Sequence, residues 1–140
     1  MLMVIPNEGK LILLNNAMCV NTPGPEDFEL ALFVANVAVA DASTFADFTL
    51  ATFTGGSPIA ISRASMPTPT IVSNVAVTTR ATPPSWTNTG ATTETAYGWI
   101  LYGATSGKVI AGQNFDTARV MSPGSVETLD PFVFKLKTFA

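Results

Sequence analysis

Four aspartates are the first residues to test for chemistry, because paired carboxylates support acid–base catalysis and metal binding. They fall in expected loops, at Asp41, Asp47, Asp116 and Asp130. A glycosidase needs two carboxylates at a set separation, and a calcium site needs several converging oxygens. The four are scattered along the chain, and no DxDxDG spacing occurs. We therefore interpret them as turn and cap residues, with no metal site and no catalytic pair among them.

Ser106 and Lys108 are a second candidate, since a serine beside a lysine can act as a nucleophile when burial deprotonates the lysine. Lys108 flanks an expected tight turn, where a lysine is usually solvated. The chain contains no histidine, which removes the commonest general base and most zinc sites. No phosphate-binding GxxxxGK[ST] loop occurs, and the lone Cys19 is interpreted as a small buried residue. The expectation is a protein that is not an enzyme and uses no cofactor.

Aromatic side chains offer a third kind of site. Flat rings with one polar group suit sugar faces, and Trp86, Trp99 and Tyr102 are the candidates for glycan stacking. Their alternation along a strand fits core and interface packing better than sugar binding. Glycan binding is therefore kept as an alternative.

Composition limits the partners. The chain has 140 residues, with 7 basic and 10 acidic side chains and a net charge of −3, which argues against nucleic acid. The longest nearly apolar stretch, residues 30–40, is too short for the roughly 20 residues of a membrane helix. Charged residues make up only 12% of the chain, against about 25% in typical soluble domains. Thr, Ser and Asn, together with a covering neighbour chain, are expected to complete the surface.

The apolar patterning predicts extended segments separated by Gly and Pro turns. Residues 28–34 alternate with a period of two, which indicates a strand with one well-buried face. In a second strand, Thr95, Tyr97, Trp99 and Leu101 are expected on one face, with Ala96, Gly98, Ile100 and Tyr102 on the other. Thr105-Ser106-Gly107 then predicts a hairpin turn in which Gly107 takes a positive φ. Residues 41–47 are expected to form a loop or short helical turn capped by Asp41 or Ser43.

The N-terminus is expected to be an arm, residues 1–16, ahead of a single domain, residues 17–140. Leu11-Ile12-Leu13-Leu14 is compatible with a strand or with one helical turn. An edge strand of the core is an equal alternative to an arm that lies on a neighbouring subunit. In the second case the contacts to the neighbour would come from two apolar runs: Met1, Leu2, Met3, Val4, Ile5, Leu11, Ile12, Leu13 and Leu14.

Short strands recur every 8–12 residues with turn signals between them. This spacing predicts an all-β fold, an antiparallel β-sandwich of about eight strands. A jelly-roll-like topology is favoured, and an immunoglobulin-like sandwich is the alternative.

Several of these segments resemble a loose family of small structural proteins from tailed-bacteriophage virions. The resemblance covers most of the chain and rests on packing and turn patterns, in residues 13–17, 30–33, 44–49, 51–55, 97–99 and 104–108, with Phe115, Gly124 and Leu129. Members often carry an aromatic residue where this chain has Gly56, and the prolines at 67, 69, 83 and 84 are particular to it.

The resemblance implies a capsid decoration (cement) protein, or a small head- or tail-fibre protein. We expect a non-enzymatic homo-oligomer, a trimer, that binds the major capsid protein on the capsid exterior and bridges neighbouring capsomers. A fibre or spike component that binds a host receptor or glycan is the alternative. A carboxylate hydrolase is a third possibility for which the sequence nominates no pair of acids.

Overall fold

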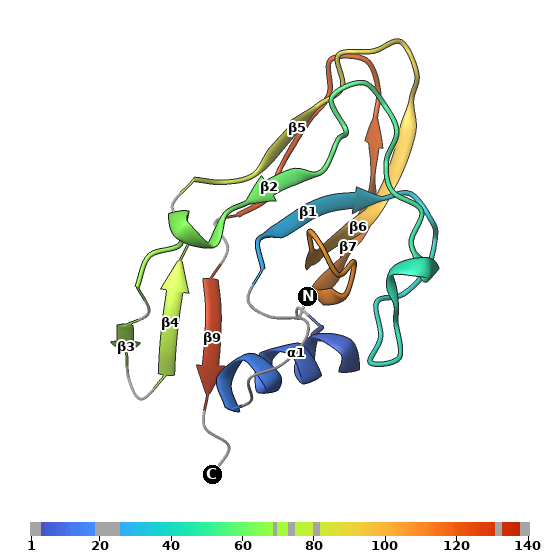
Figure 1. Ribbon diagram of the computed structural model, residues 1–140. Coiled ribbons are helices and arrows are strands. Elements are labelled where there is room, and N and C mark those ends of the chain that lie inside the picture. The colour runs from blue at the N-terminus through green and yellow to red at the C-terminus, as the bar shows by residue number, and fades with distance from the viewer. Residues whose placement is uncertain are drawn as a thin grey trace.

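A computed structural model describes residues 4–18, 26–68, 70–72, 75–79, 82–130 and 133–137, and shows a mostly β structure with antiparallel sheets (Figure 1). The elements in these ranges are α1 (Asn7–Met18), β1 (Phe28–Phe33), β2 (Ile59–Ile61), β3 (Thr70–Val72), β4 (Val75–Thr79), β5 (Ser85–Thr87), β6 (Glu94–Gly103), β7 (Val109–Met121), β8 (Val126–Thr128) and β9 (Val133–Lys137), with short 3-10 helices at Phe45–Asp47 and Arg63–Ser65. No helix in these ranges is long and apolar enough to cross a membrane.

The strands form three antiparallel sheets. The largest has the order β2-β1-β6-β7, a second has the order β3-β4-β9, and β5 pairs with β8. β1 therefore pairs on one side with β2 and on the other with β6, although β6 is far along the chain. This long-range pairing places residues 28–33 against residues 98–103.

The central sheet is covered on both faces. Leu30 and Leu32 of β1 belong to one buried cluster, which also contains Trp86 of β5. Ala31 and Phe33 belong to a second cluster, which the segment 34–50 helps to form. The expected strand at 28–34 is confirmed over Phe28–Phe33, but the expectation of one buried face is wrong, because both faces of β1 are covered.

The predicted hairpin is confirmed. β6 and β7 are antiparallel neighbours, Gly107 has a φ of 65°, and its N–H donates to the carbonyl of Gly103 at 2.9 Å. The two faces predicted for 95–102 are wrong in part. Ala96 lies in the cluster of Trp99, and Tyr97 packs against the opposite cluster, because the β6–β7 register shifts between Ala96 and Gly98. A bulge of this kind reverses the alternation that a period of two predicts.

Residues 7–18 are helical, which resolves the ambiguity of the run 11–14. The N–H of Lys10 donates to the carbonyl of Pro6 at 3.0 Å, and Glu8 lies in the first turn, where a negative charge is favourable. α1 packs against β7. Gly9 comes so close that an added Cβ would lie 2.2 Å from the carbonyl oxygen of Ile110.

The short helix Phe45–Asp47 confirms the expected helical turn, but its cap is neither Asp41 nor Ser43. The N–H and the Oγ1 of Thr44 donate to Oδ2 of Asp47 at 2.7 and 3.1 Å. The side chain of Ser43 is used elsewhere, since its Oγ accepts from the N–H of Ala40 at 2.9 Å.

Candidate functional site

The rings nominated for glycan stacking are buried. Trp86 is 1% exposed, and Trp99 and Tyr102 are each 6% exposed. Trp86 and Trp99 belong to the cluster on one face of the central sheet, and Tyr102 belongs to the cluster on the other. The prediction of a stacking platform from these three residues is therefore wrong, because their faces are covered by core side chains and do not share a surface.

The polar groups of two of these rings have partners inside the protein. Nε1–H of Trp86 donates to the carbonyl of Ser57 at 3.1 Å, and the hydroxyl of Tyr102 donates to Oε2 of Glu29 at 2.6 Å. Burial raises the pKa of the Tyr102 hydroxyl, and the hydrogen bond and negative charge of Glu29 raise it further. Tyr102 therefore stays protonated at neutral pH and acts as a hydrogen-bond donor that ties β6 to β1.

Asp47 has the local turn role expected of the loop aspartates, whereas Asp41 bonds to a residue 31 positions away. Oδ1 of Asp41 forms an ion pair with Nζ of Lys10 at 2.7 Å, and Asp47 bonds to Thr44. Asp116 and Asp130 are exposed. Within the described part of the chain, no group of three or more Cys, Asp or Glu side chains is placed to hold a metal ion.

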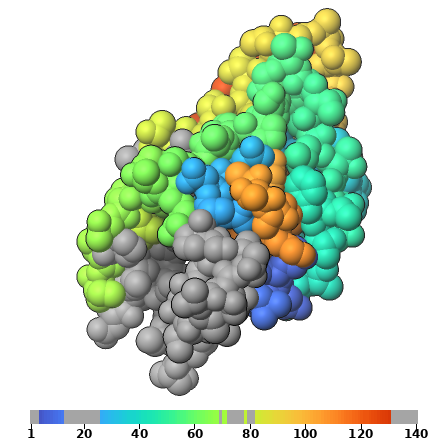
Figure 2. Space-filling view, in the orientation of Figure 1, coloured from blue at the N-terminus to red at the C-terminus, as the bar shows by residue number. Residues whose placement is uncertain are grey.

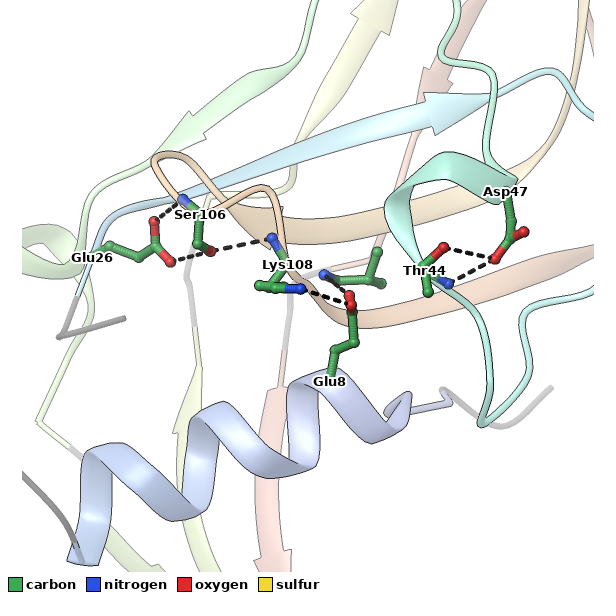
Figure 3. Close-up of polar contacts among 7 residues, drawn as sticks. Glu8, Glu26, Thr44, Asp47, Ser106 and Lys108 are labelled. Carbon is green, nitrogen blue, oxygen red and sulfur yellow. Dashed lines mark hydrogen bonds and ion pairs between the residues drawn. The ribbon is translucent and has the colours of Figure 1, made fainter. Parts of the chain in front are cut away.

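Ser106 and Lys108 do not form a nucleophile–base pair. Oγ of Ser106 donates to Oε1 of Glu26 at 2.5 Å and accepts the backbone N–H of Lys108 at 3.1 Å. Nζ of Lys108 points instead to Oε1 of Glu8, 3.1 Å away, and the side chain is 50% exposed (Figure 3). The lysine ammonium is therefore directed to Glu8 and not to the Ser106 hydroxyl, which bonds to Glu26.

A polar cluster surrounds the β6–β7 turn, and we define the turn cluster as Glu8, Glu26, Thr105, Ser106 and Lys108. Oε2 of Glu26 accepts the N–H groups of Thr105 and Ser106 at 2.7 and 2.9 Å. Burial acts to raise the pKa of Glu26, but the hydrogen bonds from Ser106 and Thr105 outweigh it and leave the pKa below its ordinary value. The turn cluster joins α1, the start of β1 and the β6–β7 turn (Figure 3).

Sequence reasoning missed both glutamates of the turn cluster. Glu26 lies 80 residues before Ser106, and Glu8 lies 100 residues before Lys108. No local pattern connects such distant positions. The one available signal was the pair of polar residues at the turn, Ser106 and Lys108, which the sequence analysis did single out.

The same carboxylate geometry recurs at Glu94. Its Oε2 accepts the N–H of Thr52 at 2.8 Å, and its Oε1 accepts the Thr52 hydroxyl. Burial acts to raise the pKa of Glu94, but the hydrogen bonds from Thr52 and Phe53 lower it overall. Glu94 therefore ties the start of β6 to the loop before β2, as Glu26 ties the start of β1 to the β6–β7 turn.

These two carboxyls predict a loss of stability in acid. Their folded-state pKa values lie below the ordinary 4.5, so their contribution is complete above pH 4.5 and is lost as the pH falls through the folded values. We expect the free energy of unfolding, measured by urea denaturation, to decrease as the pH is lowered from 5 toward 3. Replacing both Glu26 and Glu94 with glutamine should flatten this decrease. An unchanged slope in the double variant would show that other groups cause it.

The residues nominated for contact with a neighbour fall into three groups. Met1, Leu2 and Met3 lie outside the described residues, as do the side chains of Leu13 and Leu14. Val4 and Ile5 are partly buried and Ile12 is 5% exposed, whereas Leu11 is 61% exposed.

Much of the expected arm thus lies on its own chain. Val4 exchanges two backbone hydrogen bonds with Gly112 of β7, at 2.8 and 2.9 Å, and Ile12 enters the core. Leu11 is the nominated side chain that the structure shows projecting from the surface. The other large apolar side chains at the described surface are Ile71, Val120 and Val126, which are 72%, 60% and 58% exposed.

Comparison with known proteins adds no family assignment. No protein-family model matches the chain, and no curated protein matches it significantly.

Proposed function

We propose that this protein is a non-enzymatic structural component of a tailed-bacteriophage virion, a decoration protein that binds the capsid exterior as a homotrimer and bridges neighbouring capsomers. The proposal starts from the sequence resemblance. The observation that carries it further is the combination of 12% charged residues with large apolar side chains left more than half exposed, among them Leu11, Ile71, Val120 and Val126. Such a surface gains stability when a neighbouring chain covers it.

The use of the polar side chains supports a structural role. Glu26 and Glu94 accept hydrogen bonds that hold strands and loops together, and Glu8 and Asp41 are ion-paired. Candidate catalytic groups at Ser106 and Lys108 are likewise committed to internal bonds. These contacts position the backbone, as in a protein whose task is to present a rigid surface.

The finer architecture is part of the same proposal. We take the fold to be a jelly-roll-like sandwich whose N-terminal residues contact a neighbouring subunit. Two observations support the sandwich: the central sheet has a buried cluster on each face, and the β5-β8 pair contributes Trp86 to one of them. The alternative role is a fibre component that binds a glycan. It has less support, because all three rings nominated for glycan stacking are buried.

The experiment is to measure self-association and capsid binding with the full-length chain. We expect a trimer by multi-angle light scattering at micromolar concentration, and saturable binding to purified empty capsids of the virus that encodes it. Leu11→Ser should weaken capsid binding by about ten- to a hundredfold, since burying a leucine contributes roughly 1.5–3 kcal/mol.

Val126→Ser changes another exposed apolar position. Comparing its capsid binding with that of Leu11→Ser shows which of the two positions contacts the capsid. Both variants should unfold like the wild type, because both side chains are exposed. A compact monomer at millimolar concentration with no affinity for capsids contradicts the proposed function.

A further inference from the structure

The β6–β7 turn holds two separate parts of the chain. On one side, Glu26 before β1 accepts hydrogen bonds from Thr105 and Ser106. On the other side, Glu8 of α1 bonds to the next two residues of the hairpin, Lys108 through Nζ at 3.1 Å and Val109 through its N–H at 3.3 Å. In the space-filling view the turn lies at the surface between the start of β1 and the N-terminal residues (Figure 2).

Ser106 links the two sides. Its hydroxyl donates to Glu26 at 2.5 Å and accepts the N–H of Lys108 at 3.1 Å. Glu26 also lies directly against Gly103, where an added Cβ would be 2.2 Å from its Oε1. The carboxylate of Glu26 therefore holds the turn in its conformation. The hairpin also carries the two groups that Glu8 contacts, the Lys108 ammonium and the Val109 N–H.

Other attachments also hold the N-terminal segment, including the buried Pro6 side chain and the close approach of Gly9 to Ile110. Among the described residues, the Val4–Gly112 hydrogen bonds, the Asn7 N–H bond to the Asp41 carbonyl, the exposed Lys10–Asp41 ion pair and the buried Ile12 side chain add to these. Exposed ion pairs contribute little, about 0–1 kcal/mol. The contacts of Glu8 with the β6–β7 turn add to these attachments, and we expect their loss to make residues 4–12 open more easily than the central sheet.

We propose that the β6–β7 turn is a latch for the N-terminal segment: loss of the Glu26 carboxylate disorders the turn, removes the partners of Glu8 and releases residues 4–12 from β7 while the central sheet stays folded. Glu26 is thus a positioning residue that acts on α1 through Ser106 and Lys108. This inference concerns the chain itself and holds whether or not the protein is a virion component.

The charges around the turn support a latch that is closed at neutral pH and opens in acid. Among the described residues, the charged groups at the turn include Glu26 and Asp27 before β1, Lys108 on the hairpin and Glu8 of α1, with the Lys10–Asp41 pair beyond. The lowered pKa of Glu26 keeps its carboxylate ionised and the latch closed at neutral pH, and the latch opens as the pH falls through the folded-state pKa, which lies below 4.5.

The test is hydrogen–deuterium exchange on the full-length chain at pH 7, comparing wild type with Glu26→Gln. We expect protection in residues 4–12 to fall about tenfold or more, with β1 and β6 unchanged. Glu94→Gln is the matched control, because Glu94 makes the same kind of carboxylate bonds, to Thr52, away from α1. Unchanged protection of residues 4–12 in Glu26→Gln overturns the latch, as does an equal loss in β1 and β6.

A double-mutant cycle separates a latch from two independent contacts. Glu8→Gln alone should release residues 4–12 to a similar extent, and adding Glu26→Gln should then change little, because both act through the same turn. Full additivity of the two effects overturns the inference. Self-association and capsid binding are not used as readouts, so failure of the latch and failure of the proposed function are distinguishable.

Discussion

Trp86→Ala is expected to lower the free energy of unfolding by about 3–5 kcal/mol, the range for removing a fully buried tryptophan. Trp86 is 1% exposed and joins β5 to the cluster under the central sheet. The substitution removes the ring, leaves a cavity and orphans the Ser57 carbonyl that accepts from Nε1. Urea denaturation followed by far-UV circular dichroism measures the loss.

Trp86→Phe is the matched control. It keeps an aromatic ring in the core and removes the hydrogen bond to Ser57, so it should cost about 1–2 kcal/mol. A cost below about 1 kcal/mol for Trp86→Ala would mean that the β5-β8 pair does not cover the central sheet as the structure has it.

Asn88→Asp is expected to cost about 3 kcal/mol or more at pH 7, because it places an uncompensated charge in the core. Asn88 is 0% exposed. Its Nδ2 donates to the carbonyls of Thr92 and Met121 at 2.6 and 2.7 Å, and its Oδ1 accepts the N–H of Gly90 at 2.9 Å. An aspartate would direct a carboxylate oxygen at two carbonyl oxygens.

The pH dependence of this variant gives its signature. The folded-state pKa of the new carboxyl should lie above the unfolded value of about 3.9, so the penalty is largest at neutral pH and shrinks as the pH falls. This trend opposes the acid loss expected from Glu26 and Glu94. Asn36→Asp, the same change at an exposed position, should shift stability by less than about 0.5 kcal/mol. Equal costs at both positions would contradict the buried hydrogen-bond network.

Local patterns predicted the features that depend on near neighbours in the chain. The hairpin at 105–107 follows from a polar turn ending in glycine, and Gly107 has the expected positive φ. The strand at 28–33 follows from its apolar alternation. The alternation failed where a long-range pairing altered it: the shifted register of β6 and β7 moved Tyr97 to the other face.

The candidate site was less predictable, because its members come from distant segments. Ser106 and Lys108 were visible as polar residues at a turn, but their partners Glu26 and Glu8 were not. The sequence was also compatible with two roles for the aromatic rings, glycan stacking and packing in the core. Burial of Trp86 and Tyr102 decided it, and burial depends on which segments fold over each face of the sheet.

The amino-acid sequence alone established a β-rich protein with few charges, no histidine and a tight hairpin. These features depend on composition and on turn residues that are close together in the chain. Only the tertiary structure decided that residues 7–18 are a helix, that Ile12 enters the core while Leu11 does not, and that one turn binds carboxylates from two remote segments. The physical reason is that a short apolar run is compatible with a strand or a helix until a surface buries one of its sides. For Asn7–Met18 that surface is β7, more than 90 residues further along the chain.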